Sequence, residues 1–462
     1  GSEMCIRDRT TTTIAINYSF CIFKMKILLI TSEEWNDFVY CNGVLTNWFE
    51  GFPAEFAQIY VSPGLPNNHI CKKYFQITDA QMARSILGGP KAGKEIQMQT
   101  NAKQLEATKS NARRKGIYGF FKKLTLWCRT PVVALQDAIW AWGRYDVEAM
   151  KKFIKEFNPD IVYCPRKITP KLIRLERFVR TMTDAPFVAF TADDEASYQQ
   201  YEWSPLYWMR RWHMHKAFEK HVIGFYKHYW TFSKEQATDY TRQYGVPAST
   251  LYKCGDFSEP FTPHEVNKPI RLVFAGHIYC NRWKSLAAIG DALKVINRNG
   301  VKIVLDVYTI DELTKEQTKA LSPDRYINMK GAIPPAQLAK EYESTDIALH
   351  VESFDKKFRL ATRVSFSTKI IDLMATGCAI LAVCWNRHAG YQYLKEHDAA
   401  FCVDSYEDVL PLLQRIVDNP SLIQKYAKKA YDCGKRNHSR EEIQAQIKQM
   451  FEKLIRENNR NN

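Results

Sequence analysis

Short continuous apolar runs alternate with amphipathic stretches along most of this chain. A continuous apolar run is typical of a strand covered on both faces of a parallel sheet, and apolar positions at helical spacing indicate the connecting helices. The first series predicts strands over residues 26–31, 58–62, 161–165, 187–191 and 228–232. Its predicted helices cover residues 43–49, 146–156, 170–182, 206–224 and 234–244.

A second alternating series begins at Arg271. Its predicted strands cover residues 271–275, 302–308, 326–330, 347–351, 379–384 and 400–403. Its predicted helices cover residues 285–299, 334–344, 367–376 and 406–418. Two series separated near residues 260–269 predict an α/β protein with two Rossmann-like parallel-sheet domains facing across a cleft. We expect these domains to span residues 25–266 and 267–438.

Composition supports this division into two domains and indicates which kind of partner the protein binds. The chain has 462 residues, of which 45% are hydrophobic, which is too long for one core and apolar enough for two. A formal net charge of +15 favours an anionic partner such as a nucleotide, a nucleic acid or a membrane surface. Twelve cysteines without a Cys-x-x-Cys pair indicate a reducing compartment rather than a disulfide framework or a zinc knuckle.

Two features concern location. No apolar run is long enough to span a bilayer. We interpret residues 1–24 as a non-native or disordered extension, because Met25 leads directly into the first strand. We therefore expect a cytoplasmic protein that can also sit at the inner face of the membrane.

The most informative segment covers residues 365–383. Ser367 is the expected N-cap of a helix, and Gly377 stands where a left-handed cap would end it. Since a buried strand follows, the helix start should face the cleft at the carboxyl end of a sheet. Free amides at that start suit a phosphate. Lys369 adds a cation, and Asp372 can accept hydrogen bonds from a ribose.

The residues from Lys369 to Gly377 resemble the donor-site segment of retaining glycosyltransferases with the GT-B fold, such as family 4. The pattern there is Lys-x-x-Glu-x-Met-Ala-x-Gly followed by a strand, and Asp372 takes the place of the Glu that holds the ribose. The resemblance implies that Ser367, Thr368, Lys369 and Asp372 bind a nucleotide-diphosphate sugar. It also implies a GT-B fold whose last helix, residues 439–462, returns to the first domain.

A strand, loop and helix start at residues 274–286 carries the next candidates. Gly276 permits close approach of the backbone, and Arg282 and Lys284 can each neutralise a diphosphate. The resembling family uses a Gly-Arg pair and a Lys at this place. His277 replaces that first Arg, and Arg282 and Lys284 compete for the second role.

Glu352 ends another strand, in a sequence similar to the Glu-Ser-Phe-Gly with which the family binds the donor sugar or phosphate. Residues 355–366 look like an insertion before the donor helix. This insertion is basic, and it either lies over the phosphates or forms a solvated loop; its cations are Lys356, Lys357, Arg359 and Arg363.

The first domain offers fewer candidates. Gly43 follows the first strand, where GT-B enzymes have a glycine loop beside the donor phosphates and the acceptor. Asp193 and Asp194 follow a later strand, where the family often has a His-Asp pair touching the transferred sugar. The alternative for either aspartate is a helix N-cap.

The segment at residues 113–127 is both basic and aromatic. Ile117, Phe120, Phe121 and Trp127 approximate one helical face. This face either lies on an anionic bilayer or packs in the first domain. A nucleic-acid partner is disfavoured because no recognition fold accompanies the charge.

These observations favour a hexosyltransferase-type glycosyltransferase. Its partners would be a nucleotide sugar and a saccharide or lipid-linked acceptor, in surface polysaccharide or glycolipid synthesis. No acidic metal triad is visible, so we expect a metal-independent enzyme that needs no cofactor beyond its donor. The resemblance to retaining glycosyltransferases implies a retaining outcome. The alternatives are a catalytically silent GT-B scaffold that binds a partner or glycan, and a sugar-nucleotide epimerase on the same fold.

Overall fold

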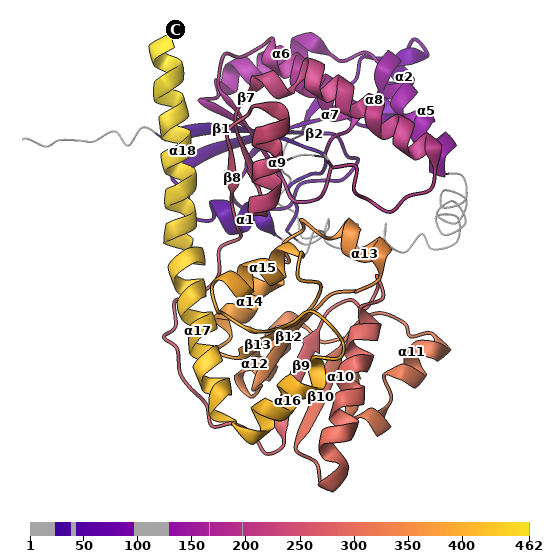
Figure 1. Ribbon diagram of the computed structural model, residues 1–462. Coiled ribbons are helices and arrows are strands. Elements are labelled where there is room, and N and C mark those ends of the chain that lie inside the picture. The colour runs from indigo at the N-terminus through magenta and orange to yellow at the C-terminus, as the bar shows by residue number, and fades with distance from the viewer. Residues whose placement is uncertain (1–23, 38–42, 97–128, 166, 196, 462) are drawn as a thin grey trace, which may run out of the picture.

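The computed structural model describes residues 24–37, 43–96, 129–165, 167–195 and 197–461. Two sheets form two domains that lie one above the other in Figure 1. All strand pairs are parallel except the pair formed by β3 and β4. The predicted architecture of two parallel-sheet α/β domains is therefore confirmed.

The first sheet has eight strands in the order β4-β3-β2-β1-β5-β6-β7-β8. Its central strand β1 pairs with β2 on one side and β5 on the other. The strands are β1 (Met25–Thr31), β2 (Ala54–Tyr60), β3 (Lys73–Gln76), β4 (Lys94–Ile96), β5 (Ile161–Pro165), β6 (Phe187–Thr191), β7 (Tyr226–Thr231) and β8 (Ala248–Thr250). The edge strands β4 and β8, and β3 next to β4, were not predicted.

The second sheet has six strands in the order β11-β10-β9-β12-β13-β14. All five residues of β12 and all five of β13 are buried, because helices cover both faces of the sheet. The strands are β9 (Ile270–Ala275), β10 (Ile303–Tyr308), β11 (Ile327–Gly331), β12 (Ile347–Val351), β13 (Ala379–Val383) and β14 (Phe401–Val403).

Helices connect the strands of both sheets. Those of the first domain are α1 (Val44–Phe49), α2 (Asp79–Ile86), α5 (Arg129–Trp142), α6 (Val147–Phe157), α7 (Pro170–Arg180), α8 (Pro205–His221) and α9 (Lys234–Tyr244). The second series has α10 (Arg282–Ile296), α11 (Lys315–Ala320), α12 (Pro335–Glu343), α13 (Lys356–Ala361), α14 (Lys369–Ala375), α15 (Ala389–Glu396), α16 (Val409–Asp418), α17 (Ser421–His438) and α18 (Arg440–Asn461). The helices α2, α5, α11, α13, α15 and α17 were not predicted.

The chain crosses between the domains twice. The first crossing joins β8 to β9, and the second joins α17 to α18, which runs along the first domain in Figure 1. The Phe451 ring of α18 packs against Tyr163 and Trp230 of the first sheet, with ring centroids 5.8 and 5.5 Å apart. The amide of Gly255 in the first crossing donates to the carbonyl of His438 in the second, at 2.8 Å. One hydrophobic cluster therefore runs through both domains beside the crossings.

Two predictions concern segments outside the described residues, namely the extension at residues 1–24, of which only Lys24 is described, and the basic aromatic segment at residues 113–127. None of the helices within the described ranges is long and apolar enough to cross a membrane.

Three buried histidines make stability depend on pH. Burial lowers the pKa of His228 from 6.5 to about 4, and that of His350 and His438 to about 3. Below pH 6.5 the unfolded chain binds protons at these imidazoles that the folded chain does not bind. Stability is therefore complete above pH 6.5 and is lost as the pH falls toward the folded values. In this window, each histidine should lower the free energy of unfolding by about 1.4 kcal/mol for each unit by which the pH falls.

Urea unfolding at pH 7 and pH 5 checks this expectation. The free energy of unfolding should be lower at pH 5, and the difference should shrink in His228→Gln. An equal pH dependence in both proteins would contradict the assignment to His228.

Candidate functional site

A cavity of about 580 Å³ lies between the two domains, at the carboxyl ends of strands from both sheets. From the first domain, Ala192, Asp193 and Phe232 line it. From the second domain, the lining includes His277, Arg282, His350, Glu352, Ser367, Thr368, Lys369, Asp372 and His388. The structure thus brings most of the predicted donor residues together around one space.

Lys369 is the first residue of α14 and places its ammonium in this cavity. The ammonium donates to the carbonyl of Ala275 at 3.3 Å. Burial lowers the pKa of Lys369, and the neighbouring charge of Arg282 lowers it further. The backbone of Gly276 passes so close that a Cβ there would overlap the Lys369 ammonium. Glycine at position 276 therefore leaves room for the cation.

Arg282 begins α10 and forms a two-bond pair with Glu352. Its Nε lies 3.0 Å from Oε2 of Glu352, and its Nη2 lies 2.7 Å from Oε1. Burial raises the pKa of Glu352, but His388 and Arg282 outweigh burial, so the pKa stays below its ordinary value. A bidentate pair fixes the guanidinium in position. The predicted acid Glu352 thus holds a cation at the cavity wall.

Lys284, one of the two competing cations, does not reach this cavity. Its ammonium pairs with Asp355 at 2.9 Å, and Lys284 is not part of the cavity lining. Residues two apart on a helix point in widely different directions. The choice between the two competing cations therefore falls on Arg282.

This choice predicts a difference between two variants. Arg282→Gln should lower the turnover of sugar transfer about 100-fold, because it removes one positive charge from the site of the leaving phosphate. Lys284→Gln should change turnover less than about threefold, since it breaks only a half-exposed ion pair. Steady-state nucleotide release measures both. Equal losses in the two variants would contradict this assignment.

The start of α14 differs from its prediction in one respect. Thr368, not Ser367, is the N-cap, and neither side chain caps the helix. The Ser367 carbonyl accepts from the amide of Ile370 at 3.0 Å. The amides of Thr368 and Lys369 have no acceptor among the described residues. These two donors are available to a ligand in the cavity.

Asp372 and His277 line the same cavity and have partners of their own. Asp372 pairs with Lys253 at 2.7 Å. Nδ1 of His277 lies 2.7 Å from Asp311. Burial raises the pKa of Asp311, but hydrogen bonds from His277 and from the Ile278 amide bring it below its ordinary value. Both predicted residues are therefore held in place at the cavity wall.

The two aspartates that follow β6 have different surroundings. Asp193 is exposed, and its carboxylate accepts from the Ser365 hydroxyl of the second domain at 3.3 Å. Asp194 is buried, accepts from the hydroxyl and amide of Ser197, and lies 3.7 Å from both Arg211 and Arg363. These contacts hold Asp194 within the protein, and Asp194 does not line the interdomain cavity.

The basic insertion does not lie over the cavity as a whole. Arg363 is buried and pairs with Glu235 of the first domain. The Lys356 ammonium lies 5.5 Å from the ring centre of Tyr201, and the Arg359 guanidinium lies 5.0 Å from that of Trp385. The expectation that these cations cover the phosphates is therefore wrong for Arg363. Its guanidinium instead forms an ion pair between the two domains.

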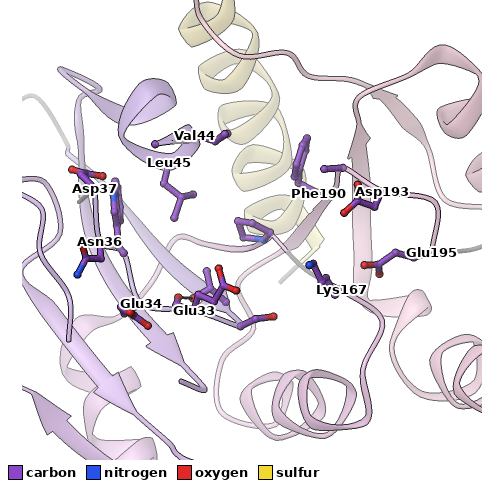
Figure 2. Close-up of a pocket in the computed structure, with 16 residues that line it drawn as sticks. Glu33, Glu34, Asn36, Asp37, Val44, Leu45, Lys167, Phe190, Asp193 and Glu195 are labelled. Atoms are coloured by element: carbon purple, nitrogen blue, oxygen red, sulfur yellow. Dashed lines mark hydrogen bonds between the residues drawn. The ribbon is translucent and has the colours of Figure 1, made fainter. Parts of the chain in front are cut away.

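A second cavity, of about 310 Å³, lies in the first domain beside the interdomain cavity (Figure 2). Gly43 lines it, just before α1, with a left-handed φ of 42° that favours glycine. Asp193 and Ala192 line both cavities. The predicted residues Gly43 and Asp193 therefore meet at this second space.

Sequence reasoning missed several lining residues. Glu33 and Glu34 directly follow the predicted strand β1, so their place at a strand end was an available signal. Lys167 follows β5 in the same way. His388 had no comparable signal, since it lies several residues beyond β13 and reaches the cavity only through the turn before α15.

One buried group has the residue types of a metal site. The ligand atoms of His350, Cys384 and His388 lie within 4.8 Å of one another. Burial lowers the pKa of both histidines, which keeps the imidazoles neutral, but it raises the pKa of the Cys384 thiol well above its ordinary value. A metal needs the thiolate. Because a bound metal ion would itself deprotonate the thiol, these shifts leave the metal-independent site as a prediction.

Comparison with known proteins adds a family and a fold. Residues 270–449 match the family described as glycosyl transferase-like. The sucrose-phosphate synthase of Thermosynechococcus elongatus is 14% identical, with a TM-score of 0.56 over 93% of this chain and 99% of that chain. HepE of Anabaena, solved in complex with UDP, is 12% identical, with a TM-score of 0.56 over 93% and 100%. WaaG, a glycosyltransferase involved in lipopolysaccharide biosynthesis, is 13% identical, with a TM-score of 0.50 over 91% and 98%.

Other comparisons contribute less. This chain covers 58% of the length of TarM, at 12% identity and a TM-score of 0.49, which is too weak a likeness to add to the others. The search of curated proteins gave no significant match. The likenesses to the solved structures, at low identity, show the shared fold.

Proposed function

We propose that this chain, a GT-B glycosyltransferase with a glycosyl transferase-like domain over residues 270–449, moves a hexose from a nucleotide-diphosphate sugar to a hydroxyl acceptor. The observation that carries the proposal is the wall of the interdomain cavity. There Lys369, Arg282 and the unpaired amides at the start of α14 face the same space. Two cations and two free amide donors are what a diphosphate requires.

The reaction follows from this arrangement. The bond between the anomeric carbon and the diphosphate oxygen breaks, and the acceptor oxygen forms the new bond to that carbon. The acceptor proton leaves with the diphosphate, so the balance needs no further reactant. Lys369 and Arg282 stabilise the charge that develops on the diphosphate, because both cations line the cavity before the substrate arrives. This chemistry needs no metal, and the proposed outcome is retention.

The remaining predicted residues take supporting roles. Asp372 would accept from the ribose, and His277, in the loop after β9, would contact the donor, since both residues line the interdomain cavity. Glu352 keeps Arg282 in position. Asp193, which lines both cavities, would contact the transferred sugar. HepE was solved with UDP and glucose, which makes uridine the first base to test.

A thermal-shift panel of uridine- and guanosine-diphosphate sugars tests the proposal. At least one donor should raise the melting temperature, because a ligand that binds only the folded state stabilises it by mass action. The same donor should release its nucleotide when incubated with the protein. Binding without any release would favour a catalytically silent scaffold, and conversion of the donor to its epimer would favour an epimerase. A panel without any shift would contradict the nucleotide-sugar site.

The proposal also covers the kind of acceptor and the contact of the protein with a membrane. WaaG acts in lipopolysaccharide biosynthesis, which supports a role in surface polysaccharide or glycolipid synthesis. The basic aromatic segment at residues 113–127, outside the described residues, is proposed to bring the first domain to an anionic membrane. Co-sedimentation with phosphatidylglycerol vesicles should decrease when Lys122 and Lys123 are both replaced by glutamate. Unchanged co-sedimentation would contradict this contact.

A further inference from the structure

The first-domain cavity has both charged and apolar lining residues. It lies at the carboxyl ends of β1, β5 and β6, and Figure 2 shows its lining side chains. Val44, Leu45 and Phe190 supply apolar surface. Because Asp193 lines this cavity and the interdomain cavity alike, a ligand bound here lies next to the sugar being transferred. The inference below rests on the proposed function and concerns the class of acceptor.

The charge of this cavity is opposite to that of the chain. The chain carries a formal net charge of +15. The acidic side chains in the cavity lining are those of Glu33, Glu34, Asp37, Asp193 and Glu195. Lys167 is the only cation among the described residues that line it. An anionic space inside a basic protein is a local feature that net charge does not explain.

Several of these carboxylates are held in place by the protein. Glu34 accepts from the Ser62 hydroxyl, and Glu195 accepts from the amide of Ile168. Asp37 accepts from the Thr46 hydroxyl at 2.5 Å. These bonds fix the positions of the carboxylates before any ligand arrives.

Glu33 differs from these carboxylates. Its carboxylate is exposed and has no hydrogen-bond or ion-pair partner among the described residues. Figure 2 places Glu33 between Glu34 on one wall and Lys167 and Asp193 on the other. Glu33 is therefore the carboxylate most available to a ligand.

Ionised carboxylates only accept hydrogen bonds. A ligand in this cavity must therefore donate, through hydroxyl or ammonium groups, while its C–H surface packs on the apolar wall. A ligand carboxylate or phosphate would meet like charges, which disfavours it. We propose that this cavity selects an acceptor whose entering end is a neutral or amino sugar, and that it excludes uronic acids and sugar phosphates.

Three matched ligands test the proposal: the p-nitrophenyl β-glycosides of glucose, glucosamine and glucuronic acid. Their binding to the full chain, in the presence of UDP, is measured by ligand-observed NMR titration at pH 6.5. The glucoside and the glucosaminide should bind, and the glucuronide should bind at least tenfold more weakly. Equal or tighter binding of the glucuronide would overturn the proposal, and so would the absence of binding by all three.

A pair of variants assigns the effect to the cavity. Glu33→Gln keeps the size of the side chain and removes the charge, so it should reduce the preference for the glucosaminide over the glucuronide at least threefold. Glu55→Gln, at an exposed position in β2 that does not line the cavity, should leave the preference unchanged. Equal changes in the two variants would overturn the role of Glu33.

The donor site is measured separately on the same samples. A thermal shift with UDP reports on the interdomain cavity, and the glycoside titrations report on the first-domain cavity. If UDP binds and the glucuronide is preferred, the charge selection fails while the proposed function stands. If no nucleotide sugar of the uridine and guanosine panel raises the melting temperature, the proposed function fails, whatever the order of the glycosides.

Discussion

Replacing Lys369 with methionine is expected to lower the turnover of sugar transfer by about 100-fold to 1,000-fold, the loss typical of removing one preorganised group that stabilises developing charge. The Lys369 side chain is exposed to the interdomain cavity, where its ammonium lies with Arg282 and donates to the Ala275 carbonyl at 3.3 Å. Methionine has a similar length and no charge, so the change removes electrostatic stabilisation and little packing. Steady-state release of the nucleotide, with the donor found by thermal shift, measures the effect.

Two further variants make this result specific. Lys302→Met changes an exposed lysine outside the interdomain cavity, beside β10, and should keep wild-type turnover. Gly276→Ala should act in the same direction as Lys369→Met, because the added Cβ would displace the ammonium. Turnover above half of the wild-type value in Lys369→Met would rule out its proposed role.

The second large effect is on stability. Arg363→Met should lower the free energy of unfolding by about 3 kcal/mol, the lower end of the cost of breaking a buried ion pair from one side. Arg363 is only 1% exposed and joins the second domain to Asp194 and Glu235 of the first. Its removal leaves those carboxylates without one of their counter-charges.

Urea unfolding followed by tryptophan fluorescence measures this loss. Arg387→Met is the matched control, because Arg387 is exposed and its guanidinium lies over the Trp385 ring at 5.7 Å. That control should change stability by less than about 0.5 kcal/mol, as surface substitutions usually do. Similar losses in both variants would show that burial of Arg363 contributes little.

The strands at the centre of each sheet were predictable because their neighbours bury both faces. Residues 161–165, 187–191 and 347–351 were predicted to the residue, and each has a continuous apolar run. The strand β3, next to the edge strand β4, was missed, since it is short and begins with an exposed lysine. The short helix α13 was missed because its basic sequence is also typical of a solvated loop.

The candidate site was predictable to the level of strand ends and loops. The sequence placed Lys369, Arg282 and Glu352 after strands of one sheet, and parallel topology brings such positions to one edge. The sequence did not show whether Arg282 or Lys284 reaches the cavity, because that depends on which face of α10 points toward the cavity. It gave Arg363 no buried role, because its partner Glu235 lies 128 residues away in the sequence.

The paired crossings near Gly255 and His438 determine how the two domains can move apart. Since both links lie side by side, a rotation that opens the cleft without straining the chain must turn about this point, as a hinge. In Figure 1, α13, which precedes Arg363, lies on the other side of the molecule from α18. The ion pairs of Arg363 with Asp194 and Glu235 therefore have to break when the two domains rotate apart about this hinge.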